Sequence, residues 1–128
     1  MNDLQMLFIR GMQTIKPEAK PEDILHALVD GMTSGRLKVF VKGTHAFVIL
    51  AIPETPYDVL QIMHFYAERP GDKKALMDKV LAFAKEKGYT RFWALNATDK
   101  PDKVWERTFR SEAWDISPIR TLFEFKVK

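Results

Sequence analysis

Three polar side chains alternate along an otherwise apolar stretch, and each of them can exchange a proton. His64, Tyr66 and Glu68 stand two residues apart, so in a β-strand they share one face of the sheet. Histidine and glutamate can act as general bases, and tyrosine as a general acid, within hydrogen-bonding distance of a reacting group. A strand face that is partly exposed to water, with these residues in structural roles, explains the same pattern.

A loop with one glycine and three basic residues follows this stretch directly. Residues 69–75 read Arg-Pro-Gly-Asp-Lys-Lys-Ala, and a helical pattern begins at their end. Free amides at a helix N-terminus bind anions, and glycine lets a phosphate oxygen approach the backbone. The loop therefore predicts a phosphate site at Gly71, where the basic residues add positive charge and Asp72 opposes it. An ordinary proline-glycine turn with Asp72 as the helix N-cap is the alternative interpretation.

The spacing of apolar residues predicts the elements that hold this loop. Val59–Ala67 has the aliphatic and aromatic content of a central, largely buried strand. Between Leu76 and Ala84 apolar residues recur every three or four positions, and Gly88 follows as a C-terminal cap, which predicts a helix. The next strand, residues 90–95, begins within two residues of Gly88, so the helix connects two parallel strands. The loop thus opens the helix of a β-α-β unit.

The first half of the chain is predicted to form two helices and a hairpin. One helix is expected from Asp3, available as its N-cap, to Ile15, and a second helix opens at Pro21. Residues 37–42 and 46–52 flank a Gly-Thr turn and form an antiparallel hairpin. A short connection leads from this hairpin to the central strand, which makes a three-stranded meander.

The last third of the sequence is predicted to add a short helix and one or two closing strands. A loop is expected at residues 96–101, the helix at 102–111, and a terminal strand or hairpin at 114–128. The clearest alternation in this tail covers residues 123–128.

The composition restricts the classes of protein to which the chain can belong. Its 128 residues, 46% of them hydrophobic, are enough for one domain with its own core, so a single domain over residues 1–128 is expected. The lack of cysteine excludes disulfides, thiolate zinc sites and cysteine nucleophiles. The three histidines lack metal-ligand spacing, so no metal site is predicted. No apolar run approaches the roughly 20 residues of a membrane span, and no signal pattern is present, which predicts a cytoplasmic protein without a membrane partner.

The charge of the chain permits anion binding without requiring it. Twenty basic and 17 acidic residues are well mixed and give a net charge of +3. A dedicated nucleic-acid binder has a denser basic surface, so nucleic acid is not the expected partner.

The order of predicted elements resembles the GNAT superfamily of N-acetyltransferases over nearly the whole chain. The fold class is α/β (α+β), a mixed sheet in the order helix, helix, three strands, helix, strand, helix and one or two strands. Where the superfamily has a loop of the pattern Arg/Gln-x-x-Gly-x-Gly/Ala, whose amides hold the pyrophosphate of acetyl-CoA, this chain has residues 69–75. Residues 81–89, Leu-Ala-Phe-Ala-Lys-Glu-Lys-Gly-Tyr, look like the family's usual exit from the following helix. Short GNAT-like proteins of tailed phages are a looser comparison.

The resemblance implies transfer of an acyl group from acetyl-CoA to an amine of a small molecule or a protein. In that reaction Glu68 and His64 are the candidate bases, and Tyr66 is the nearest phenol. The residues implied in binding acetyl-CoA are Phe65, Tyr66 and Ala67 of the strand and Arg69, Gly71, Asp72, Lys73, Lys74 and Ala75 of the loop.

Two departures from the family pattern keep a non-catalytic function open. The second small residue of the loop is replaced by Lys74, unless a longer loop places Ala75 there, and the family's tyrosine acid aligns with Phe109, which has no proton to donate. The alternative is therefore a GNAT-fold interaction or structural module, for example a phage virion or host-takeover protein. Its partner would be another protein or a second copy of the chain, in the host cytoplasm or the virion. Polyanion binding through the basic loop is a third hypothesis.

Overall fold

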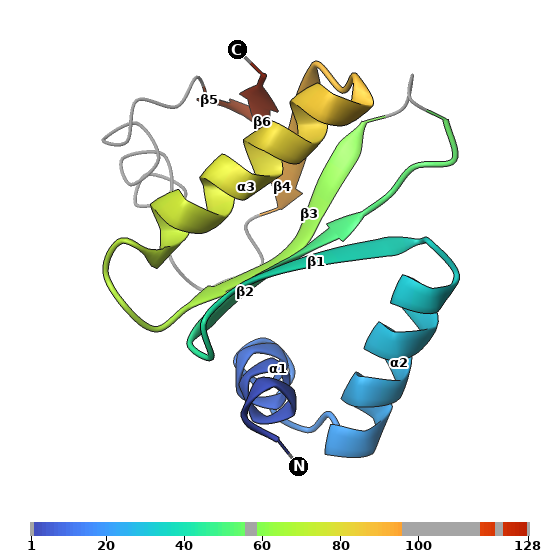
Figure 1. The fold of residues 1–128 in the computed structure, drawn as a ribbon, viewed down its shortest axis with the longest axis vertical. Helices are drawn as coiled ribbons and strands as arrows, with labels where there is room; N and C mark the ends of the chain where they lie inside the picture. The colour runs from blue at the N-terminus through green and yellow to red at the C-terminus, as the bar shows by residue number, and fades with distance from the viewer. Residues whose placement is uncertain (1, 56–58, 96–115, 120–121, 128) are drawn as a thin grey trace.

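A computed structural model describes residues 2–55, 59–95, 116–119 and 122–127, in which helices cover both faces of one mixed sheet. Figure 1 shows α1 and α2 on one face and α3 on the other. The helices are α1 (Asp3–Gln13), α2 (Pro21–Thr33) and α3 (Asp72–Lys87). The strands are β1 (Leu37–Lys42), β2 (Ala46–Ala51), β3 (Leu60–Ala67), β4 (Arg91–Leu95), β5 (Ile116–Ile119) and β6 (Leu122–Lys126). This arrangement confirms the predicted fold class.

The sheet has the strand order β1-β2-β3-β4-β6-β5. β1, β2 and β3 pair antiparallel, which confirms the meander, and β3 pairs parallel with β4 across α3, which confirms the β-α-β unit. β6 lies antiparallel to β4 and pairs with β5 as a hairpin, as expected for the tail. The helix predicted at residues 102–111, including Phe109, lies outside the described residues.

The start of α1 corrects one prediction. Asn2, not Asp3, is the N-cap, because its side chain accepts the amide of Gln5 at 2.8 Å while the Gln5 side chain accepts the amide of Asn2 at 3.0 Å. These two bonds form a capping box, which satisfies two helix-end amides at once. Asp3 instead lies in the first turn of the helix.

β2 runs through the middle of the core, with Ala46 to Leu50 buried. Val48 and Leu50 pack toward α3, whereas Phe47 and Ile49 pack toward α1 and α2. A strand covered on both faces is apolar throughout, which explains the continuous run in the sequence. Full burial of such side chains stabilises the fold by roughly 1.5–3 kcal/mol each.

β3 contains an extra residue at the point where its pairing with β4 ends. Ile49 of β2 pairs with His64 and the next residue, Leu50, pairs with Ile62, so Met63 forms a β-bulge. On the other side, the register between β3 and β4 ends at Ile62 and Ala94, while β3 continues through residues 63–67. We call Ile62, Met63 and Ala94 the junction. It is the place where the central strand loses its parallel neighbour.

Candidate active site

The N-terminus of α3 is open. Gly71 is its N-cap, with φ +86° in the left-handed region, which favours glycine, and no side chain among the described residues caps the helix. A Cβ atom built on Gly71 would meet no atom of the described residues within 4 Å. The residue that sequence analysis placed at the centre of the phosphate loop therefore leaves free space at a helix start.

Two amides at this helix start are available to a ligand. The Asp72 amide donates to the carbonyl of Arg69 at 3.3 Å. The amides of Lys73 and Lys74, which follow it, have no acceptor among the residues that the structure describes. Free amides in the first turn, together with the helix dipole, favour a bound anion.

The side chain of Asp72 is turned to a different partner. The residue as a whole is 5% exposed, and the Oδ2 atom of its side chain lies 2.8 Å from Nδ1 of His45. One part of the alternative interpretation is therefore wrong: Asp72 does not cap the helix but is its first residue, and its carboxylate binds the β1–β2 turn.

The three basic residues of the loop differ in whether they form a salt bridge. Lys74 pairs with Asp78 one turn along the helix, with Nζ and Oδ2 at 3.2 Å. Arg69 and Lys73 form no salt bridge within the described part of the chain, and Arg69 is exposed. Arg69 and Lys73 are thus the side chains best placed to contact an anion at the helix start.

The carboxylate of Glu68 is already held by two donors. Arg10 of α1 binds it through both oxygens, with Nε–Oε2 at 2.9 Å and Nη2–Oε1 at 3.2 Å, and the Tyr66 hydroxyl donates to Oε2 at 2.7 Å. The Arg10 hydrogen bond, followed by that of Tyr66, lowers the pKa of Glu68. The pKa of Tyr66 is raised, mainly by burial and secondly by the hydrogen bond to Glu68. At neutral pH the pair is therefore a carboxylate and a protonated phenol, and Glu68 is a weak base.

His64 is buried against α1, with 7% of its surface exposed. Its Nε2 lies 2.8 Å from the carbonyl oxygen of Gly11, so Nε2 carries the proton and donates. Burial lowers the pKa of His64 despite this hydrogen bond, which keeps the ring neutral. Nδ1 then has a free lone pair, and no described residue donates to it.

The structure confirms that His64 and Tyr66 of β3, and Glu68 directly after it, point to the same side of the sheet, which faces α1. It also separates them along the strand. At a rise of about 3.3 Å per residue, His64 and Glu68 are roughly 13 Å apart. Glu68 adjoins the open helix start, whereas His64 follows the junction.

Sequence reasoning missed three residues of this region. Arg10 and His45 contact it from distant parts of the chain, so no local spacing indicated them. Met63 is 56% exposed in the middle of a central strand, and only the β-bulge explains why. An exposed methionine within an apolar run gives no signal in a single sequence.

Two further properties bear on the chemistry of the site. In the described ranges there is no group of three or more His, Asp or Glu side chains placed to hold a metal ion. Of the helices described, none combines the length and the apolar character that crossing a membrane requires.

Comparison with known proteins identifies the fold. No protein-family model and no curated protein matches the sequence. Among solved structures, an N-acetyltransferase from Staphylococcus aureus Mu50 is similar with a TM-score of 0.67 and 12% identity, over 98% of this chain and 93% of that one. YncA from Salmonella typhimurium, solved with acetyl-CoA, is similar with a TM-score of 0.64 and 9% identity, over 98% of this chain and 88% of that one. The PaiA N-acetyltransferase from Thermoplasma acidophilum, in complex with coenzyme A, is similar with a TM-score of 0.61 and 15% identity, over 97% of this chain and 91% of that one.

These identities are too low to carry an activity from one protein to another. They do agree over almost the full length of the chain in the arrangement of helices and strands. The chain therefore has the fold of the GNAT N-acetyltransferases, with 9–15% identity to the three structures compared.

Proposed function

We propose that this chain is an acyl-CoA-dependent N-acyltransferase, which moves an acetyl group from acetyl-CoA to an amine of a small molecule or a protein. The observation that carries the proposal is the open N-terminus of α3, where Lys73 and Lys74 present free amides beside Gly71. Two structures with the same fold hold coenzyme A or acetyl-CoA. A diphosphate is the part of that cofactor which such a helix start binds best.

The course of β3 suggests where the rest of the cofactor lies. With the diphosphate at Gly71, the pantetheine arm extends back along Phe65, Tyr66 and Ala67 toward the junction. Residues 60–62 of β3 are paired directly with β4, which leaves no room between the two strands, so the arm ends at Ile62. From Ala67 to Met63 the strand covers roughly 13 Å, a length that an extended pantetheine arm can span. The thioester is thus placed near Met63 and His64.

This placement separates the two candidate bases. The amine nitrogen attacks the thioester carbon, an N–C bond forms, the C–S bond breaks, and the amine proton passes to a base. His64 lies at the thioester end, is neutral, and has a free lone pair on Nδ1. Glu68 lies at the diphosphate end, where Arg10 lowers its basicity. We therefore assign the base to His64 and a positioning role to the pair of Glu68 and Tyr66.

Two measurements test the proposal. In calorimetric titration, acetyl-CoA should bind with a micromolar Kd, and millimolar or weaker binding would remove the enzyme hypothesis. Turnover is then measured by release of free thiol with a panel of amines. His64→Gln keeps a donor for the Gly11 carbonyl but removes the basic nitrogen, so kcat should fall about 100-fold. Glu68→Gln, the matched control, should retain most of kcat, and the reverse result would move the base to Glu68.

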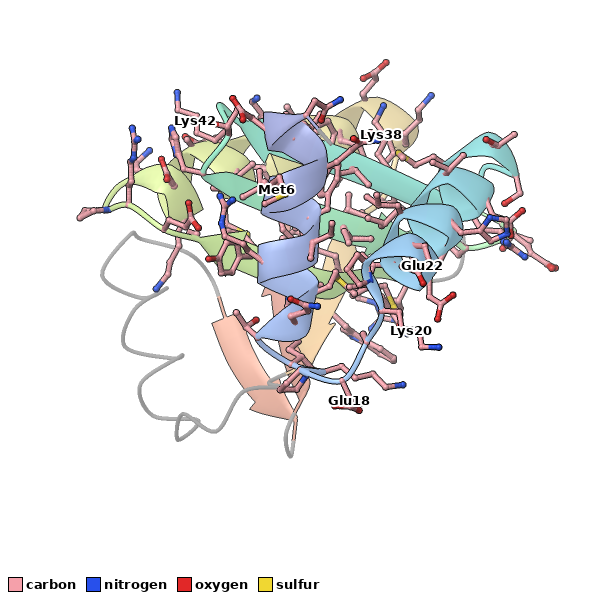
Figure 2. The ribbon with its side chains drawn as sticks, turned by 90° about the horizontal axis from the view of Figure 1, so that it is seen from below. Met6, Glu18, Lys20, Glu22, Lys38 and Lys42 are labelled. Carbon is pink, nitrogen blue, oxygen red and sulfur yellow. The ribbon has the colours of Figure 1, made fainter. Side chains whose placement is uncertain are left out.

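The outer surface of α1 and α2 favours a second candidate function. It exposes large apolar side chains, as Figure 2 shows for Met6 on α1. These side chains are Leu4 (38% exposed), Met6 (44%), Val29 (59%) and Met32 (41%). Exposed apolar residues favour association, so a non-catalytic interaction module, with a protein partner or a second copy, is the alternative.

Light scattering coupled to size exclusion tests this alternative. A mass above that of one chain, returned to one chain by Val29→Lys, would support association through α2. A monomer that binds acetyl-CoA would count against the alternative.

None of the three compared structures supports the phage origin suggested by the sequence, which stays a prediction.

A further inference from the structure

His45, in the turn between β1 and β2, contacts both ends of the loop that opens α3. We infer that His45 is a positioning residue of the diphosphate site and acts through the carboxylate of Asp72. The inference rests on the proposed function, because it concerns the same ligand. It adds a residue from a distant hairpin that no loop pattern includes.

The two contacts of His45 bracket the loop. Its carbonyl accepts the amide of Glu68, the first residue after β3, at 3.0 Å. Its Nδ1 lies 2.8 Å from Oδ2 of Asp72, the first residue of α3. One residue thereby fixes both the point where the chain leaves the strand and the point where it enters the helix.

The imidazole ring of His45 is itself held in place. Its side chain is 18% exposed and that of Asp72 is 7% exposed, so the pair is largely removed from water. A Cβ atom built on Gly43 would come within 2.7 Å of Nε2, which means that the turn closes directly over the ring. A buried hydrogen bond between such groups is strongly directional and sets the position of both partners.

This pair decides what the helix start can bind. A carboxylate in the first turn of a helix is attracted to the free amides there and competes with any other anion. Because His45 holds the Asp72 carboxylate, the amides of Lys73 and Lys74 are left without an acceptor in the described structure.

The first test compares the affinity for coenzyme A of four proteins by calorimetric titration. His45→Ala should raise the Kd about tenfold, as expected for loss of one buried charge-assisted hydrogen bond. His45→Asn should restore most of the affinity, because its side-chain amide can donate near the position of Nδ1. Lys42→Ala is the matched control: Figure 2 shows Lys42 at the outer end of the same hairpin, exposed to solvent.

The second test asks whether His45 acts through Asp72. Asp72→Ala and the double variant with His45→Ala complete a double-mutant cycle. The effect of His45→Ala should vanish in the Asp72→Ala background, whereas independent contributions would multiply and contradict the inference. With acetyl-CoA as substrate, His45→Ala should raise KM and leave kcat unchanged, since the junction is untouched.

The outcomes separate the inference from the proposed function. If the wild-type protein does not bind coenzyme A, the proposed function fails. If the wild type binds and a folded His45→Ala protein binds equally well, only the role of His45 is overturned. Equal weakening by Lys42→Ala and His45→Ala would also overturn it, because it would show a general effect of charge. Thermal melting of each variant confirms that it is folded at the temperature of titration, and His45→Asn carries the test if the alanine variant is not.

Discussion

The helices α1 and α3 begin in opposite ways. α1 closes its first turn with its own side chains, through the capping box of Asn2 and Gln5. α3 begins at Gly71 with no side-chain cap, and its nearest carboxylate, on Asp72, is bound elsewhere. The same chain thus satisfies one helix end internally and leaves another for a ligand.

The start of α2 shows that lack of a side-chain cap is not sufficient for anion binding. Lys20 is its N-cap and makes no capping hydrogen bond, but Pro21 removes one of the amides. Glu22 and Asp23 add negative charge to the first turn, which repels an anion. Of these three helices, α3 alone combines free amides, open space at the N-cap and basic neighbours.

The largest effect is expected from adding a methyl group at the open helix end. Gly71→Ala places a Cβ in the space where a phosphate would approach, so the Kd for acetyl-CoA should rise at least tenfold. Gly88→Ala is a matched control, because Gly88 caps the other end of α3 with φ +84° and equally open space. Both variants should lose about 1–2 kcal/mol of unfolding free energy from the left-handed backbone. Equal affinities in the two variants would contradict the difference between the helix ends.

Removing the cap of α1 should affect stability alone. Asn2→Ala deletes one half of the capping box and should lower the free energy of unfolding by about 1 kcal/mol in urea titration. Asp3→Ala, which removes only an acidic group of the first turn, should cost about 0.3–1 kcal/mol at low salt and less as salt is added. The Kd for acetyl-CoA should not change in either variant. A weaker Kd in Asn2→Ala would show that α1 contributes to the binding site.

Replacing either lysine of the loop should change the Kd for acetyl-CoA by a smaller factor than Gly71→Ala does. Lys73→Ala should raise the Kd for acetyl-CoA about threefold, the size of an exposed charge interaction. Lys74→Ala should do less, because its charge is shared with Asp78. Raising the salt concentration should reduce both effects. The opposite ranking would indicate that the ligand displaces Asp78 from Lys74.

The smallest effect expected is a dependence of stability on pH, caused by His64 of β3, which contacts the C-terminal end of α1. Burial lowers the pKa of His64 below its ordinary value of 6.5, so the unfolded chain binds this proton more readily than the folded one. The stabilising contribution of neutral His64 is therefore present above that value and is lost as pH falls below it. Between pH 7 and pH 5 the wild type should lose more unfolding free energy than His64→Gln. Parallel curves would show that His64 is not the group responsible.

Local patterns in the sequence predicted the framework of the fold. The helices, the meander and the β-α-β unit all depend on apolar periodicity and on glycine or proline at the ends of elements, which act over a few residues. The position of the open loop at Gly71 was predictable for the same reason. The N-cap of α1 was misplaced by one residue, because Asn2 and Asp3 are both good capping residues and only the Gln5 contact distinguishes them.

The contacts that tune the candidate site were beyond such patterns. Arg10 and Glu68 are 58 residues apart, and His45 and Asp72 are 27 apart, so only the folded sheet brings them together. The position of Met63 depends on the register between β2 and β3, which one sequence does not fix. The roles assigned to the loop and strand residues in catalysis and cofactor binding stay predictions until the titrations above are made.

The single unpaired residue in β3 has a consequence for the evolution and engineering of this chain. Because facing repeats every two residues, Met63 reverses the phase of every side chain that follows it. Deletion of Met63 would place His64 directly after Ile62 in a regular ladder, so His64 and Tyr66 would still face α1 and Phe65 would still face α3. Deletion of Met63 should therefore be tolerated better than deletion of Phe65, which would move Tyr66 to the opposite face of the sheet.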